Sequence, residues 1–248
     1  MKSKVLIIGL LCSLTACHGM FDDIYDEPQE HVDIKEGQLY IDASSWTDWH
    51  YINLNATTDK VVKMSIPTEA ADASHRVSPP PLGTEGLYTY WYDVFGEGLS
   101  KHEYRSFTPT APQPEPEEWH IAVHRNNVRT NGGAAYETLY TSMKNLPESS
   151  EAFADATFTE DTWNELDVWT IQAQMLQGLI GNQGIKVNCV LSSWLKVSLP
   201  PVPPTFTQNN HVFIIKFKDG TFGAIQLENY QSPTGVKCCL TINYKYPF

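Results

Sequence analysis

Short runs in which hydrophobic and polar residues alternate follow one another along most of the chain, and this is the pattern of half-buried β-strands. The first runs are GQLYIDA (37–43), WHYINLN (49–55) and KVVKMSI (60–66). LYTYWYDVF (87–95) follows the proline-rich SPPPLG, and WHIAVHR (119–125) follows the proline-rich TPTAPQPEPEE. Each run therefore predicts a strand that ends where the turn-forming residues begin.

The last third of the chain predicts an antiparallel meander. HVFIIKF (211–217) is followed by an Asp219-Gly220 turn, then by FGAIQLENY (222–230) and CCLTINYKY (238–246). In the first of these strands, alternation directs Phe213, Ile215 and Phe217 to the core. In the last strand it places Cys238 on the core face and Cys239 on the outer face.

Strands in series with few helical patterns indicate an all-β fold, an antiparallel sandwich with little helix. The segment between Glu151 and Gln177 is the ambiguous part, because DTWNELDVWTIQAQMLQ (161–177) is compatible with a helix or an irregular arm. No internal repeat is found.

The N-terminus has the features of a secretory signal. Two lysines precede an apolar run from Val5 to Leu14 that is too short to span a bilayer. Leu14-Thr15-Ala16-Cys17 resembles a bacterial lipobox, with lipidation at Cys17; an ordinary cleaved signal is the alternative. We therefore expect residues 1–16 to be a lipoprotein signal peptide, 17–34 an acidic tether and 35–248 a single all-β domain. The acidic FDDIYDE (21–27) is either a surface-export signal, as in Bacteroidetes lipoproteins, or a solvated linker.

The charge balance argues against nucleic acid as a partner. The chain carries a formal charge of −12, which becomes −14 when Lys2 and Lys4 leave with the signal peptide. Binding to phosphates requires a basic face. Seven tryptophans and twelve tyrosines leave open a surface that stacks on sugars, although aromatic residues also fill β cores.

The sequence contains no pattern typical of an enzyme. There is no GxSxG, no HExxH and no glycine-rich phosphate loop. The four carboxylates of TEDTWNELD (159–167) could form a glycosidase pair, but a solvated edge is the plainer interpretation. Cys189, Cys238 and Cys239 have no zinc-site spacing, and a disulfide from Cys189 to either neighbour is left open.

Three further segments carry a resemblance to a known family. EWHIAVHRNNVRTNGGAAY (118–136) is a Trp-led strand ending in His-Arg, followed by an Asn/Gly-rich turn. SSWLKVSLPPVPPTF (192–206) combines Trp-Leu with a proline-rich crossover, and NNHVFIIKFKDGTFGAIQLENY (209–230) forms a closing hairpin. In this order and spacing, from about residue 35 to 248, the chain resembles the HmuY-like haemophore family of Bacteroidetes surface lipoproteins.

This resemblance implies a haem-binding lipoprotein on the outer membrane that takes haem (iron protoporphyrin IX) from host haemoproteins. The protein would be anchored only through its lipid, with release from the cell as an alternative, and would pass haem to a TonB-dependent receptor. The best-known branch holds the iron between two histidines about thirty residues apart. Here Asn131 to Gly184 contains no histidine, and Met143 and Met175, separated by 32 residues, fall where the family places its ligands.

The resemblance thus implies that Met143 and Met175 are the axial iron ligands, as in methionine-using branches of the family. A thioether is soft and uncharged, so it favours Fe(II) and has no proton that competes with coordination. Without the resemblance, both methionines are ordinary core residues, and Met64 remains one. Lys144 is the only basic residue from Asn131 to Ile185, so the sequence leaves open which groups meet the haem carboxylates, with water as one alternative. Apolar cover is expected from Leu139, Tyr140, Leu146, Phe158, Trp163, Trp169, Ile171 and Leu176.

His120 and His124 are the rival ligands, because positions i and i+4 of a strand project from one face. The alternative is that they are structural residues. His31, His50, His75, His102 and His211 are scattered, and none is assigned a site. A second hypothesis for the whole chain is a surface glycan-binding lipoprotein that uses aromatic platforms, since its anchor, charge and aromatic content would be the same.

Overall fold

A computed structural model describes residues 32–66, 82–84, 86–96, 98–100, 113–199, 201 and 203–248. These residues form antiparallel sheets with one short α-helix and three 3-10 helices, which is the all-β fold expected from the sequence. The predicted signal peptide, Cys17, His31, His75 and His102 lie outside the described residues. Within the described part, no helix combines the length and the apolar character that crossing a bilayer requires.

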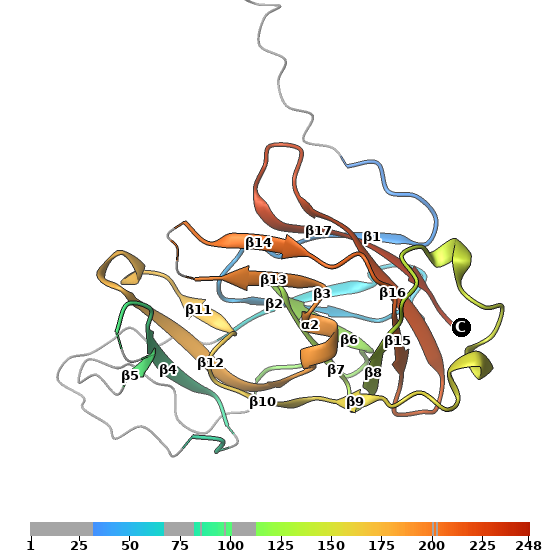
Figure 1. The fold of residues 1–248 in the computed structure, drawn as a ribbon, viewed down its shortest axis with the longest axis horizontal. Coiled ribbons are helices and arrows are strands. Elements are labelled where there is room, and N and C mark those ends of the chain that lie inside the picture. The colour runs from blue at the N-terminus through green and yellow to red at the C-terminus, as the bar shows by residue number, and fades with distance from the viewer. Residues whose placement is uncertain are drawn as a thin grey trace, which may run out of the picture.

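A six-stranded sheet forms one layer of a sandwich (Figure 1). In spatial order its strands are β1 (Gln38–Asp42), β17 (Lys237–Lys245), β16 (Phe222–Gln231), β15 (Phe213–Lys216), β8 (Ala134–Glu137) and β9 (Thr159–Glu160). β15 and β16 of the meander β15-β16-β17 are joined by a turn at Gly220, whose φ of 85° is the left-handed conformation that glycine adopts without strain. The C-terminal hairpin pattern is therefore confirmed.

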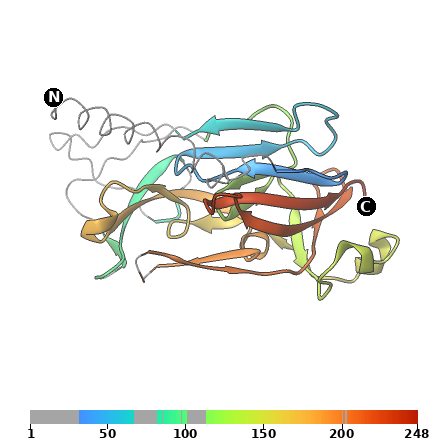
Figure 2. The same ribbon diagram turned by 90° about the horizontal axis from the view of Figure 1, so that it is seen from above.

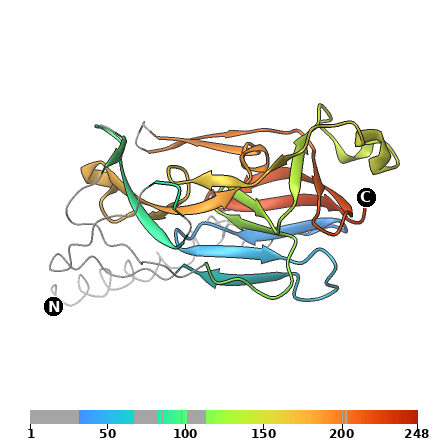
Figure 3. The same ribbon diagram turned by 90° about the horizontal axis from the view of Figure 1, so that it is seen from below.

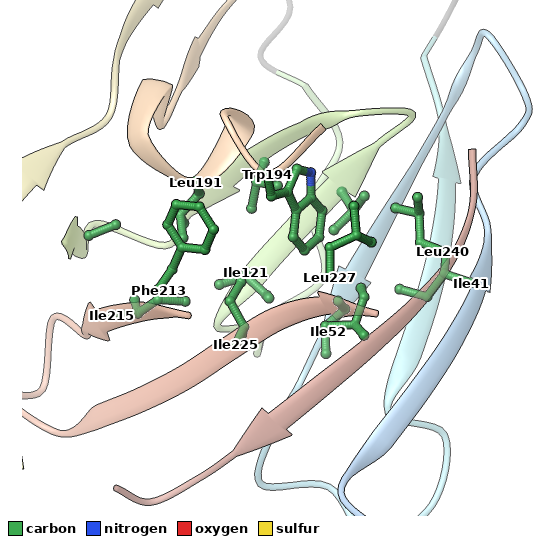
Figure 4. Close-up of a cluster of buried hydrophobic side chains, with 14 of the residues drawn as sticks. Ile41, Ile52, Ile121, Leu191, Trp194, Phe213, Ile215, Ile225, Leu227 and Leu240 are labelled. Carbon is green, nitrogen blue, oxygen red and sulfur yellow. The ribbon is translucent and has the colours of Figure 1, made fainter. Parts of the chain in front are cut away.

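A four-stranded sheet packs against this layer. Its order is β3 (Val61–Ser65), β2 (Asp48–Ile52), β6 (Ile121–His124) and β7 (Asn127–Thr130). The main core lies between the two sheets, and Phe213, Ile215 and Phe217 point into it as the alternation predicted. Figure 4 shows this core, in which Trp194 lies among Leu191, Leu227 and side chains of both sheets.

A third sheet extends the molecule beyond the sandwich. It contains β10 (Thr162–Asn164), β12 (Leu179–Val187), β4 (Tyr88–Asp93) and β5 (Gly98–Ser100), and β11 (Trp169–Ile171) also pairs with β12. After β12 come α2 (Cys189–Ser192) and the ribbon of β13 (Leu195–Ser198) and β14 (Thr205–Gln208). The ambiguous 161–177 segment is thus an irregular arm of short strands rather than a helix.

Three 3-10 helices occupy loops at the two ends of the molecule. η1 (Met143–Asn145) and η2 (Ser150–Phe153) follow β8, and η3 (Met175–Gln177) joins β11 to β12. Figures 2 and 3 show the yellow-green segment with η1 and η2 beside the C-terminus, and the orange turn of η3 at the opposite end beside β4. Both turned views agree with Figure 1 on this separation.

The placement of Cys239 on an outer face is wrong. Cys238 takes a φ of 65°, which interrupts the regular alternation of β17, and both thiols are buried. The Cys239 thiol lies 3.5 Å from an Asp42 carboxylate oxygen on the neighbouring strand. Cys189, Cys238 and Cys239 are all free thiols, and Cys189 is exposed on α2.

Candidate functional site

Met143 lies at the start of η1, in a loop that is tied to the six-stranded sheet. The Thr138 hydroxyl donates to the Val212 carbonyl over 2.7 Å, and the Gln226 side-chain amide donates to the Thr141 carbonyl over 2.9 Å. The Ser142 side chain caps η1 by accepting from the Lys144 backbone N–H. These bonds satisfy backbone groups that an irregular loop would otherwise leave unpaired.

Aromatic side chains support Met143 on the outer face of this sheet. Met143 is partly buried against a cluster built on Phe153, Val212, Ile214 and Ala224. The aromatic members of the cluster contact one another with ring centroids about 6 Å apart, and they are Tyr136, Phe153, Phe158, Phe222 and Phe248. Two apolar side chains of the same loop face solvent, since Leu139 is 88% and Tyr140 is 36% exposed.

A cavity of about 490 Å³ opens beside Met143. Met143 and Tyr244 line it together with Lys35, Lys144 and Lys245. Its volume lies within the range of pockets that hold small ligands, roughly 300–1,000 Å³. The cavity thus offers a thioether, an aromatic ring and several ammonium groups to one ligand.

Met175 occupies a different place in the fold. It begins η3, which ends at Gly178 in the left-handed conformation with a φ of 88°. Its side chain packs against a cluster of Val94, Trp169 and Ile180. Leu176 and Phe95 nearby are 83% and 63% exposed, so this tip also presents apolar surface.

The structure does not bring Met143 and Met175 together. They belong to separate hydrophobic clusters, and Figure 1 places η1 beyond β8 at one end and η3 beyond β11 at the other. The apolar residues expected to cover the haem are likewise split between the two methionines. Leu146 and Phe158 pack with Met143, whereas Trp169 packs with Met175. In this conformation Met143 and Met175 lie at opposite ends of the molecule, each in a separate hydrophobic cluster.

His120 is held by structural hydrogen bonds. Its Nδ1 accepts from the Leu54 backbone N–H over 3.2 Å, so its proton resides on Nε2, which is 3.2 Å from the Tyr246 hydroxyl. The ring also packs edge-on against Phe217 and Tyr246. Partial burial lowers the pKa of His120. Both ring nitrogens are therefore engaged within the fold.

His124 is a core residue. Its side chain is fully buried, and Nε2 donates to the Trp46 carbonyl over 2.9 Å. Burial lowers the pKa of His124 from 6.5 to about 4, so the ring is neutral at physiological pH. Its Nδ1 is buried without a hydrogen-bond partner among the described residues. The burial of His124 and the two hydrogen bonds of His120 fit the structural interpretation of both residues.

The burial of His124 predicts a stability that depends on pH. Its pKa is lower in the folded chain than in the unfolded chain, so its contribution is complete above 6.5 and is lost as the pH falls toward 4. Between pH 7 and pH 5 we expect His124 to remove about 2 kcal/mol of unfolding free energy. Urea unfolding at the two pH values measures this loss, and the His124→Gln variant, which keeps a donor for Trp46, should show a smaller one.

Two neighbouring histidines and one carboxylate modify this pH dependence. Burial also lowers the pKa values of His50 and His120, so these residues further reduce the free energy of unfolding as the pH falls. Burial raises the pKa of Asp161, which increases the free energy of unfolding as the pH falls. The comparison of wild type with His124→Gln isolates the share of His124. Equal losses in both proteins would contradict the assignment.

The acidic segment 159–167 is not simply a solvated edge. Asp161 is partly buried, and its carboxylate accepts from the Thr130 backbone N–H and from the Asn188 amide. Glu165 accepts from the Trp163 indole N–H and from the Gly83 backbone N–H. Asp161 and Glu165 therefore hold loops in place.

The tryptophans do not form a sugar-stacking platform. Five of the seven are buried, and Trp46 and Trp163 are partly buried. Within the described residues, no group of three or more His, Cys, Asp and Glu side chains is arranged to hold a metal ion. His50 is buried, and His211 pairs with Glu137 through Nδ1 at 2.7 Å.

Sequence reasoning missed Lys35 and Lys245 as residues of the Met143 cavity. Both are distant from Met143 along the chain, and they reach it because the 35–38 turn and β17 lie side by side, with the Tyr244 N–H donating to the Gly37 carbonyl over 2.8 Å. The pairing of β1 with β17, which brings these residues together, appears only in the structure, so the sequence offered no signal for them.

Comparisons with known proteins give consistent matches. A family model described as HmuY protein matches residues 45–244. A solved structure from Bacteroides vulgatus, described as HmuY-like and haem-binding, is 31% identical, with 85% of this chain and 91% of that chain covered and a TM-score of 0.57. No curated protein matches the chain at a significant level.

Two further solved structures resemble this chain. A Bacteroides fragilis protein described as a lipoprotein is 25% identical, with 88% of this chain and 93% of that chain covered and a TM-score of 0.57. The apo form of a Tannerella forsythia HmuY analog is 22% identical, with 86% and 97% covered and a TM-score of 0.58, which is a likeness of fold.

Proposed function

The chain belongs to the HmuY family, and we propose that it is a haem-binding surface lipoprotein that captures haem and delivers it to a TonB-dependent outer-membrane receptor. Lipid on Cys17 would anchor it to the outer membrane through the 17–34 tether, leaving the domain from residue 35 exposed at the cell surface. Host haemoproteins are the proposed source of haem. The proposed role is binding and transfer, without catalysis.

The observation that carries this proposal is the cavity beside Met143. A partly exposed methionine there adjoins a ligand-sized space, and the loop around it exposes Leu139 and Tyr140. Haem combines a broad apolar ring, two carboxylates and an iron that accepts axial donors. Thioether, apolar surface and ammonium groups therefore match the three parts of this ligand.

We propose Met143 and Met175 as the axial iron ligands, with Met143 making the first contact. Since Met175 lies at the other end of the molecule, one chain joins both sulfurs to one iron only if the segments of η1 and η3 move together. The exposed Leu139 and Leu176 support such a movement, because closing the tips on a porphyrin would remove their apolar surface from water.

Haem titration of the purified protein tests the proposal. We expect a Soret change that saturates at one haem per chain, with tighter binding under dithionite than in air, because soft sulfur favours Fe(II). Each tenfold preference for ferrous haem should raise the reduction potential of the bound iron by about 59 mV, which potentiometry measures independently. Absence of a Soret change, or tighter binding of ferric haem, would contradict the proposal.

A further inference from the structure

We propose that Lys35, Lys144 and Lys245 form a carboxylate-binding edge of the Met143 cavity, which receives the two propionates of haem. This inference rests on the proposed function and assigns the orientation of the ligand. The sequence left the contacts of the haem carboxylates open, because Lys144 is the only cation in its segment.

Three separate segments supply these lysines to one cavity. Lys35 lies in the turn before β1, Lys144 lies within η1 next to Met143, and Lys245 ends β17. The turn and β17 are fastened together, since the Gln38 side-chain amide donates to the Asn243 side chain over 2.7 Å and the Tyr244 N–H donates to the Gly37 carbonyl. Lys35, Lys144 and Lys245, all three exposed, therefore line one cavity although they come from three different segments.

The ammonium groups of these lysines are not consumed by ion pairs. Among the described residues, the salt bridges involve other side chains, and Lys245 Nζ lies 4.4 Å from the centre of the Phe248 ring. The chain has a formal charge of −12, with 17 Lys and Arg against 29 Asp and Glu, so lysines outside ion pairs are notable. Three lysines at one cavity, none of them in an ion pair among the described residues, thus indicate an anionic ligand.

Two carboxylates share the cavity and limit what it accepts. Glu36 follows Lys35, and Glu228 accepts from the Asn243 side-chain amide over 2.9 Å. The balance of three cations against two anions favours a ligand with few, localised negative charges over a polyanion. A porphyrin with two propionates at one edge has this distribution, while its apolar remainder would lie toward Met143 and Tyr244.

Dimethyl esters of the porphyrins lack the free carboxylates, so comparing acid with ester tests the carboxylate-binding edge separately from haem binding itself. Titrations would compare haem with haem dimethyl ester, and iron-free protoporphyrin IX with its dimethyl ester, by Soret absorbance and by quenching of tryptophan fluorescence. The wild type should bind each free acid about tenfold more tightly than its ester, because exposed ion pairs each contribute modestly. The iron-free pair reports on the carboxylates without any contribution from axial ligation.

The triple variant Lys35→Gln/Lys144→Gln/Lys245→Gln should lose this preference and bind acid and ester alike. Lys216→Gln, which changes an exposed lysine of β15 outside the cavity, is the matched control and should keep it. If haem binds but the wild type does not distinguish acid from ester, or the triple variant still does, the carboxylate edge is wrong and haem binding stands. If the wild type gives no Soret change with haem, the proposed function itself is wrong.

Discussion

Replacing Met143 by leucine is expected to weaken the binding of ferrous haem by at least about a hundredfold. Loss of groups that merely orient a metal ligand already costs about 10–100-fold in affinity, and Met143 is proposed to coordinate the iron directly. Leucine keeps the apolar volume that packs against Phe153 and Ile214, so the fold should lose less than about 1.5 kcal/mol. Titration under dithionite with parallel urea unfolding measures both quantities.

Two other methionines provide the comparison. Met64 in β3 packs against the cluster of Trp49 and Tyr51 and is proposed to have no contact with haem, so Met64→Leu should bind haem like the wild type. Met175→Leu should weaken binding less than Met143→Leu, and its complex should have the spectrum of iron that has lost one axial ligand. Wild-type affinity in Met143→Leu would overturn the ligand assignment.

Much of the fold could be predicted from alternation, because a strand with one buried face repeats every two residues. Strands of the structure coincide with the runs at 37–43, 49–55, 60–66, 87–95 and 211–246, with β2 beginning one residue before its run, at Asp48. Alternation failed at Cys239, where the left-handed backbone of Cys238 breaks the period. It also gave no answer for 151–177, whose short strands are defined by partners in β8 and β12 rather than by local pattern.

The candidate site could be predicted only in part. Spacing alone did not distinguish Met143 from a core methionine, and family resemblance provided the assignment. The cavity depends on the approach of the 35–38 turn, η1 and β17, which are far apart in sequence, so Lys35 and Lys245 could not be assigned to it. The separation of Met143 from Met175 was equally hidden, because 32 residues of irregular chain can close a loop or span the molecule.

Replacing Trp194 by alanine should have the largest effect on stability, about 3–5 kcal/mol. Trp194 is fully buried between the two sheets of the sandwich (Figure 4), and its indole N–H donates to the Asn126 carbonyl over 2.9 Å. The Trp194 backbone carbonyl accepts from the Asn209 N–H over 2.8 Å, which ties the end of the β13–β14 ribbon to the core and is unaffected by the substitution. Urea unfolding measures the loss, and a cost of this size is a large part of the stability of a typical domain.

Trp194→Phe keeps the protein folded and separates stability from haem binding. Phenylalanine retains most of the packing but leaves the Asn126 carbonyl unpaired, so we expect a smaller loss of about 2 kcal/mol. Trp194 packs on the inner face of the six-stranded sheet, whereas Met143 packs on its outer face, so haem affinity should stay within about twofold of the wild type. Trp194→Phe should therefore lower the free energy of unfolding and keep the haem affinity, whereas Met143→Leu should lower the haem affinity and largely keep the free energy of unfolding. Parallel losses of haem affinity in both variants would mean that the Met143 cavity forms only as part of the central core, and that the outer-face site proposed here does not exist as a separate unit.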